Sequence, residues 1–113
     1  MNSIAIVGRL ARDPEARTAN SGTSLANFSV AVDGWDAAAK ERKATFFRVT
    51  AFGKNAEYVV QYGHKGGAVA VHGQMQERRY TDRDGNEKYS WEIAADRVEL
   101  VGGGRAQEQE ETW

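Results

Sequence analysis

Residues 44–52 carry side chains whose types and spacing suit the binding of bases and phosphates. If this segment is a strand, its side chains point alternately to opposite sides, so Phe46, Arg48 and Phe52 share one side. The other side, which carries Phe47, suits a hydrophobic core. Aromatic rings stack on bases and cationic groups bind phosphates, which is the combination that sites for single-stranded nucleic acid use. The spacing therefore predicts a half-buried strand whose solvent-facing side suits such a ligand.

The composition predicts one globular domain without a metal or a cofactor. A chain of 113 residues is long enough for one hydrophobic core. It contains no cysteine, and two histidines, His64 and His72, are too few for a zinc site. No apolar run approaches the roughly 20 residues of a membrane-spanning helix. The segment after Met1 lacks a basic and apolar leader, so we expect a cytoplasmic protein without membrane contact.

The distribution of charge is compatible with an anionic ligand, although the formal net charge is −1. All 15 Lys and Arg residues lie within residues 1–105, where only 13 Asp and Glu residues accompany them. The other acids are Glu108, Glu110 and Glu111. The body of the chain is therefore mildly positive and its end is negative, and salt should weaken the binding of a polyanion strongly.

Periodicity predicts five strands and one helix. Alternating apolar residues mark strands at residues 4–10, 25–32, 44–52, 68–81 and 88–101, and a helical period marks a short helix at residues 56–62. Gly63 follows the helix, where a glycine is favoured. Turn residues separate these elements at 12–14, 18–23 and 82–86.

Two irregular features are also predicted. Residues 33–42 are charged and rich in alanine, which indicates a mobile loop that carries Trp35. In the last strand the apolar positions change phase, which predicts a β-bulge near Asp96.

The order of these elements predicts an all-β protein with a five-stranded OB-fold barrel. In that fold a short helix between strands three and four caps the barrel, and the last two strands form a long hairpin here. A β-sandwich or an SH3-like barrel would give a similar pattern. We expect residues 1–101 to form the domain and residues 102–113 to form a short disordered acidic tail.

Several short segments resemble the bacterial single-stranded DNA-binding proteins. They are Ile6-Val7-Gly8-Arg9-Leu10 with Asp13-Pro14-Glu15, Ala26-Asn27-Phe28, Phe47-Arg48-Val49 with Phe52-Gly53-Lys54, and His72-Gly73-Gln74 with Tyr80 and Asp84-Gly85. Each segment alone is weak, but the series in consistent order over residues 2–101 is specific. The resemblance implies an OB-fold, a nucleoid-associated role in replication, recombination and repair, and assembly into a homotetramer or, less often, a dimer.

The resemblance also implies which residues bind DNA. The aromatic positions that stack on bases in the family correspond here to Trp35, Phe46, Phe52 and Tyr80. The positions that contact phosphates correspond to Arg17, Arg48, Lys54, Lys65, Arg78 and Arg79, and Arg9 adds a positive charge where the family usually has a polar residue. The expected function is sequence-independent binding and protection of single-stranded DNA.

Family members usually end in an acidic peptide with a terminal aromatic residue, which recruits replication and repair proteins. This chain ends in Glu110, Glu111 and Trp113, which keep that character after a much shorter linker. The resemblance therefore implies a partner-binding tail.

Other interpretations of these residues remain open at this point. Aromatic residues on strands more often pack than bind, so Phe46 and Phe52 could cover another subunit. Trp91 has the parity of Ile93, which predicts a place in the core or in a subunit contact. The domain could also be a primosome accessory or another protein-interaction module. We do not expect an enzyme, because no catalytic motif is present in the sequence.

Overall fold

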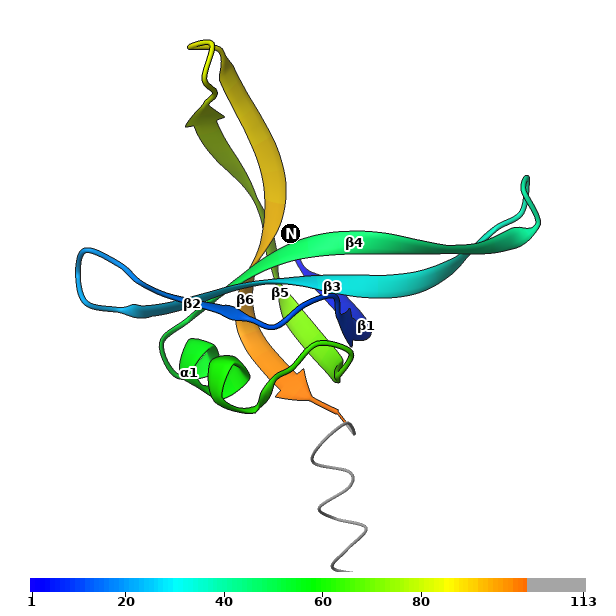
Figure 1. The fold of residues 1–113 in the computed structure, drawn as a ribbon, viewed down its shortest axis with the longest axis horizontal. Coiled ribbons are helices and arrows are strands. Elements are labelled where there is room, and N and C mark those ends of the chain that lie inside the picture. Colours follow the sequence, from blue (N-terminus) through cyan, green and yellow to red (C-terminus); the bar gives the residue numbers. More distant parts are fainter. Residues whose placement is uncertain (102–113) are drawn as a thin grey trace, which may run out of the picture.

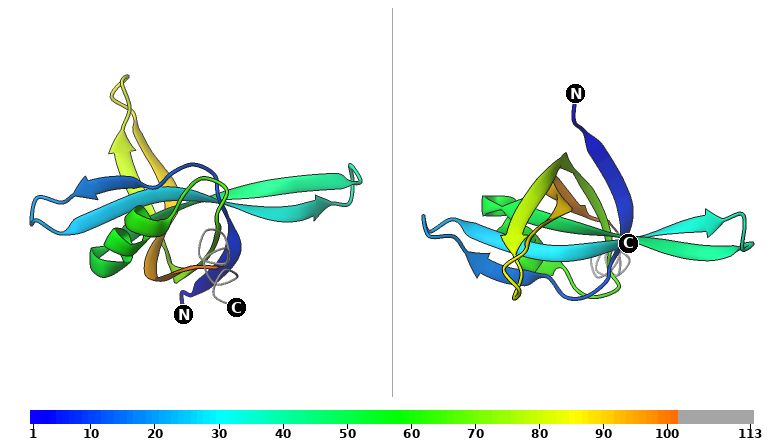
Figure 2. Two further views of the ribbon diagram at one scale, coloured as in Figure 1. Left: turned by 60° about the horizontal axis from the view of Figure 1, so that its bottom comes forward. Right: turned by 90° about the horizontal axis from the view of Figure 1, so that it is seen from above.

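The computed structural model describes residues 1–101, which form a small β-barrel with one helix at its end (Figure 1). The elements in chain order are β1 (Ile4–Leu10), β2 (Glu15–Thr18), β3 (Ser24–Asp36), β4 (Glu41–Phe52), α1 (Gly53–Tyr62), β5 (Ala68–Thr81) and β6 (Glu87–Leu100). Two long hairpins, β3–β4 and β5–β6, extend beyond the barrel in different directions (Figures 1 and 2).

Five strands close the barrel. They run in the order β1-β5-β6-β4-β3, and pairing of Arg9 with Ala31 and of Leu10 with Val30 joins β3 back to β1. The contact between β4 and β6 is parallel, and the other pairings are antiparallel. The helix α1 lies between β4 and β5, which are the third and fourth strands of the barrel. The predicted all-β OB-fold barrel is therefore confirmed.

The barrel interior is filled by the alternating apolar residues of the strands. The largest fully buried side chains are Leu10, Val30, Val49, Val59, Val69 and Ile93. The helix contributes Val59 and Ala56 to this core, and the hydroxyl of Tyr58 accepts a hydrogen bond of 3.0 Å from the backbone N–H of Leu100. The helix is therefore fixed across one end of the barrel, as the expected fold requires.

A close approach of two backbones closes the barrel at Gly8. A Cβ atom at this position would lie 2.2 Å from the carbonyl oxygen of Ala31. No side chain fits there, so glycine allows β1 to reach β3.

The predicted β-bulge is confirmed at Asp96. His72 pairs with Arg97 and Gly73 pairs with Ala95, which leaves Asp96 as the extra residue of β6. The imidazole of His72 bonds the Asp96 carboxylate at 2.8 Å, so a side-chain contact accompanies the bulge. The bulge explains why the buried positions of β6 change phase.

The predicted mobile loop at residues 33–42 is wrong. The antiparallel ladder of β3 and β4 continues to the pair Asp36 and Glu41, and Trp35 faces Arg42 within it. The tight turn that remains is held by the Asp36 carboxylate, which accepts bonds from the backbone N–H groups of Ala38 and Ala39 at 3.0 and 3.1 Å. Trp35 thus lies on a strand, where its direction is fixed by the pleat.

The short strand β2 was not expected from the sequence. All four of its residues are exposed, and it is held to β3 by backbone pairing. A strand without a buried face leaves no alternating pattern to detect.

Of the two places predicted for Trp91, the core is wrong, and a subunit contact stays a prediction. Its side chain is 57% exposed. Trp91 does have the parity of the buried Ile93, but it lies farther along the β5–β6 hairpin, where it pairs with Glu77 instead of a residue of the core.

Candidate nucleic-acid interface

Three of the predicted stacking residues lie on one side of the β3–β4 hairpin. Directly paired residues of an antiparallel sheet point to the same side. Ala31 pairs with Phe46, Leu25 pairs with Phe52, and Trp35 pairs with Arg42, all with the parity that faces away from the core. We call this side of β2, β3 and β4 the outer face. Trp35 and Phe46 are each 65% exposed and Phe52 is 42% exposed, so their rings are available for stacking.

The outer face continues onto the β5–β6 hairpin. Thr50 of β4 pairs with Ala94 of β6, and Ala94 pairs with Gln74 of β5, so these three residues lie on the same side. Every second residue of β5 after Gln74 also lies on this side, and these residues are Gln76, Arg78 and Tyr80. Tyr80 is 47% exposed. The fourth predicted stacking residue therefore shares the continuous surface of the other three.

A hollow of about 310 Å³ lies in the outer face beside Arg48 and Thr50, which lie between Phe46 and Phe52 along β4. We call it the Glu92 hollow, after the buried carboxylate in its lining. Its charged and polar lining residues are Arg12, Arg17, Arg48, Arg78, Glu15, Glu92, Asn27, Ser29 and Thr50. Four guanidinium groups against two carboxylates give it a positive formal charge, which suits a phosphate-bearing ligand.

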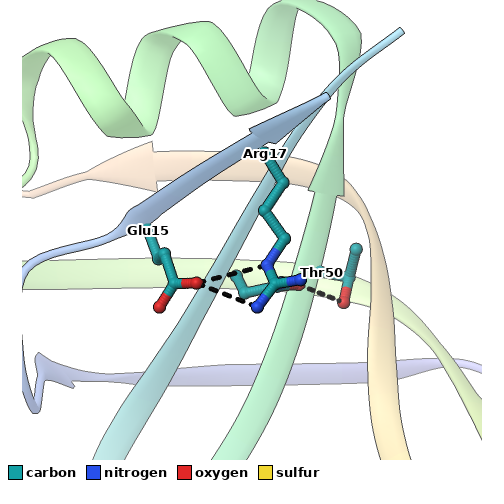
Figure 3. Close-up of polar contacts among 4 residues, drawn as sticks. Glu15, Arg17 and Thr50 are labelled. Carbon is teal, nitrogen blue, oxygen red and sulfur yellow. Dashed lines mark hydrogen bonds and ion pairs between the residues drawn. The ribbon is translucent and has the colours of Figure 1, made fainter. Parts of the chain in front are cut away.

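Two of the predicted phosphate-binding arginines are held by neighbouring acids. Arg17 donates from Nε and Nη2 to one carboxylate oxygen of Glu15, at 3.2 and 3.0 Å (Figure 3). Arg9 donates to Asp33 at 3.0 Å. Each of these side chains is more than half exposed. Exposed ion pairs contribute only about 0–1 kcal/mol, so a phosphate can compete for either arginine.

Arg48 lies between Phe46 and Phe52 on the outer face of β4. It has no ion pair within residues 1–101. Because its guanidinium stays available beside the rings, Arg48 is the best placed of the predicted phosphate-binding residues.

The structure separates three other predicted phosphate-binding residues from this group. Arg79 lies on the reverse side of the hairpin from Tyr80 and pairs with Glu77 at 2.8 Å and Glu87 at 3.5 Å. Lys54 is on α1, beside the end of β6. Lys65 lies in the connection from α1 to β5, where its backbone N–H donates to Asp13 at 2.7 Å.

Sequence reasoning missed Glu92 and Arg12 as parts of this surface. Glu92 is only 6% exposed, and its Oε2 accepts a hydrogen bond from the hydroxyl of Thr50. In the sequence Glu92 stands out only as an acidic residue directly before the apolar Ile93. Its contacts could not be predicted, because they depend on the long-range alignment of β4 with β6.

Residues 1–101 contain no cluster of three or more potential metal-binding side chains. In the same residues no helix has the length and apolar character needed to span a membrane. The predicted tail residues Glu110, Glu111 and Trp113 lie outside the residues that the structure describes.

The fold and the outer face define an OB-barrel protein with exposed aromatic rings and arginines on one surface. The chain belongs to the single-strand binding protein family, whose model matches residues 1–101.

Several curated relatives carry corresponding names. The chain is 39% identical over 102 residues to Single-stranded DNA-binding protein 1 of Staphylococcus aureus strain MSSA476. This alignment covers 89% of this chain and 65% of the relative. It is 36% identical over 102 residues to Single-stranded DNA-binding protein 3 of Clostridium acetobutylicum, with 89% and 71% covered. It is 36% identical over 106 residues to the Single-stranded DNA-binding protein of Neisseria meningitidis serogroup B, with 91% and 61% covered. The chain thus spans less than two thirds of the staphylococcal and neisserial relatives.

Proposed function

We propose that this protein binds single-stranded DNA along the outer face, with little dependence on sequence. The observation that carries this proposal is the placement of Trp35, Phe46 and Phe52 on one exposed side of β3 and β4, with Arg48 among them. Membership of the single-strand binding protein family and the names of the relatives support it.

In this mechanism stacking and charge act on different parts of the DNA. Each base that stacks on an exposed ring contributes about 1–3 kcal/mol, and every base has a flat face, so sequence matters little. Arg48, with Arg17 and Arg78 at the Glu92 hollow, binds phosphates and releases their counterions. Bound bases are then unavailable for pairing and are shielded from nucleases. We expect the protein to act in this way during replication, recombination and repair in the cytoplasm, at the nucleoid, without catalysis.

Self-association is part of the proposal. The edge of β1 from Ile4 to Gly8 pairs with β5 but not with β3, and Val7 on this strand is 66% exposed. Trp91 offers a second exposed apolar surface. These features support assembly of a homotetramer or a dimer, and we further propose that residues 102–113 serve as a short tail that docks replication and repair proteins.

The test is a binding titration with a fluorescently labelled oligo(dT) and a duplex of the same length at low salt. We expect tight binding to oligo(dT), weak binding to the duplex, and a steep loss of affinity with added salt. Light scattering with and without oligo(dT) then reports the mass of the assembly. Failure to bind oligo(dT) at low salt would overturn the proposal. Binding to a helicase loader without binding to oligonucleotides would favour a protein-interaction module.

A further inference from the structure

We propose that the Glu92 hollow receives the edge of one base of the bound DNA and favours guanine at that position. The inference rests on the proposed function, since the base arrives as part of a bound single strand. It adds one position of modest base preference to binding that otherwise depends little on sequence.

The first step of the argument is the incomplete hydrogen bonding of the Glu92 carboxylate. An ionised carboxylate accepts only, at about four lone-pair positions on its two oxygens. The Thr50 hydroxyl occupies one position on Oε2. The nearest cation, Nη1 of Arg78, lies 3.8 Å from Oε1, which is beyond hydrogen-bond distance. Glu92 is only 6% exposed, and its Oε1 accepts no hydrogen bond within residues 1–101, so the carboxylate keeps the capacity to accept further donors.

The second step concerns which atom donates in the hydrogen bonds that Thr50 makes in the hollow. The Thr50 hydroxyl lies 3.1 Å from Asn27 Oδ1 as well as within reach of Glu92, but it has one proton to donate. Donation to the charged carboxylate is the stronger bond. Asn27 Oδ1, which faces the same hydroxyl, then remains as a second acceptor beside Glu92.

The third step is the match between these acceptors and a base. The Watson–Crick edge of guanine carries two adjacent donors, N1–H and the 2-amino group, which are complementary to a pair of carboxylate oxygens. Thymine offers one N–H between two carbonyl oxygens, which a carboxylate repels. Cytosine and adenine each present one exocyclic amine, and acidic side chains do accept from such amines. Guanine is therefore the base that fits best, and thymine the base that fits worst.

The position of the hollow makes such a contact geometrically reasonable. Phe46 and Phe52 are separated by six residues along β4, or about 20 Å at the usual rise of a strand. Arg48 and Thr50, both in the lining of the hollow, lie between them on the same side. DNA that stacks on both rings must pass over the Glu92 hollow, and Arg48 can hold a phosphate there while the base turns inward.

The test compares short oligo(dT) ligands that carry one central guanine, inosine or thymine. Inosine differs from guanine only by the missing 2-amino group, so the comparison isolates one of the two donors. We expect guanine to bind about fivefold tighter than thymine, which is the low end for a bidentate contact to a base. Inosine should lie between them. Equal affinities for guanine and thymine would overturn the inference and leave the proposed function intact, whereas no binding to any ligand would overturn both.

Variants of the protein sharpen the test. Glu92→Met keeps the length of the side chain and removes its acceptors, and Arg78 can remain hydrated because its side chain is 59% exposed. This variant should lose the preference for guanine and still bind oligo(dT). Glu57→Gln, on α1 and away from the hollow, should keep the preference and serves as the control. A preference that persists in Glu92→Met would contradict the inference. If that variant does not fold, the comparison of guanine with inosine on the unmodified protein decides.

Discussion

The outer face of β3–β4 and the reverse side of the β5–β6 hairpin both expose aromatic rings beside arginines, but they differ in how those arginines are paired. On the outer face Phe46 and Phe52 flank Arg48, which has no ion pair within residues 1–101. On the reverse side Trp91 accompanies Arg79, which pairs with Glu77 and Glu87.

This difference shows that exposed rings alone do not identify a site for DNA. Two carboxylates around one guanidinium give the reverse side a negative formal charge, which repels phosphates. The Glu92 hollow in the outer face has an excess of guanidinium groups. We therefore expect the same kind of side chain to bind DNA on one surface and to contact a protein on the other.

The largest expected effect is the loss of affinity for oligo(dT) when an aromatic ring is removed from the outer face rather than from the reverse side. Phe52→Ala should weaken binding to oligo(dT) by about 1–3 kcal/mol, or roughly 5- to 150-fold, because a base loses its stacking partner. A titration at constant salt measures it. The variant Phe52→Leu keeps an apolar side chain but has no flat ring. It should also bind oligo(dT) weakly if stacking, rather than apolar contact, stabilises the complex. Tyr89→Ala, on the reverse side where Tyr89 pairs with Arg79 and is 61% exposed, should retain the affinity, and a comparable loss in that variant would break the distinction between the surfaces.

The next effect concerns the arginines. Arg48→Ala should lower the slope of log K against log salt by about one, because one phosphate contact and its released counterion are lost. Arg79→Ala should leave the slope nearly unchanged, since Arg79 lies on the reverse side of the hairpin, away from the outer face. Titrations over a series of salt concentrations measure both. Equal decreases of the salt slope in Arg48→Ala and Arg79→Ala would show that both surfaces contact phosphates.

The smallest effect concerns Glu15, which pairs with Arg17 on the outer face. Glu15→Gln should raise the affinity for oligo(dT) by about twofold, because an exposed ion pair that DNA must displace contributes little. The variant Glu77→Gln provides the matched control, since its partner arginine is on the reverse side. A loss of affinity in Glu15→Gln would indicate that Glu15 positions Arg17 rather than competing for it.

Alternation predicted the strands of the barrel because each of them has a buried side. The bulge at Asp96 was predictable for the same reason, since it shifts buried positions out of phase. The sequence did not reveal β2 or the outer end of β3 near Trp35, because backbone pairing holds these segments and few of their side chains are buried.

The exposed placement of the predicted stacking residues followed from the sequence, whereas the environment of Glu92 did not. Parity placed Phe46 and Phe52 on the solvent-facing side, and the resemblance to the family added Trp35 and Tyr80. Contacts of Glu92 with Thr50 depend on the alignment of β4 with β6, which are 42 residues apart in sequence at this contact. The core is wrong as a place for Trp91 because parity gives the side of a strand but not the point at which a hairpin leaves the barrel, and a subunit contact stays a prediction.

The most direct test of the central claim uses the tryptophans as reporters of the two surfaces. A variant with Trp91→Phe and Trp113→Phe retains Trp35 on the outer face, and a variant with Trp35→Phe and Trp113→Phe retains Trp91 on the reverse side. Each is titrated with oligo(dT) at low salt while its fluorescence is followed. We predict strong quenching of Trp35 and little change at Trp91. Unchanged Trp35 emission at saturating oligo(dT), with quenching of Trp91 instead, would contradict binding along the outer face.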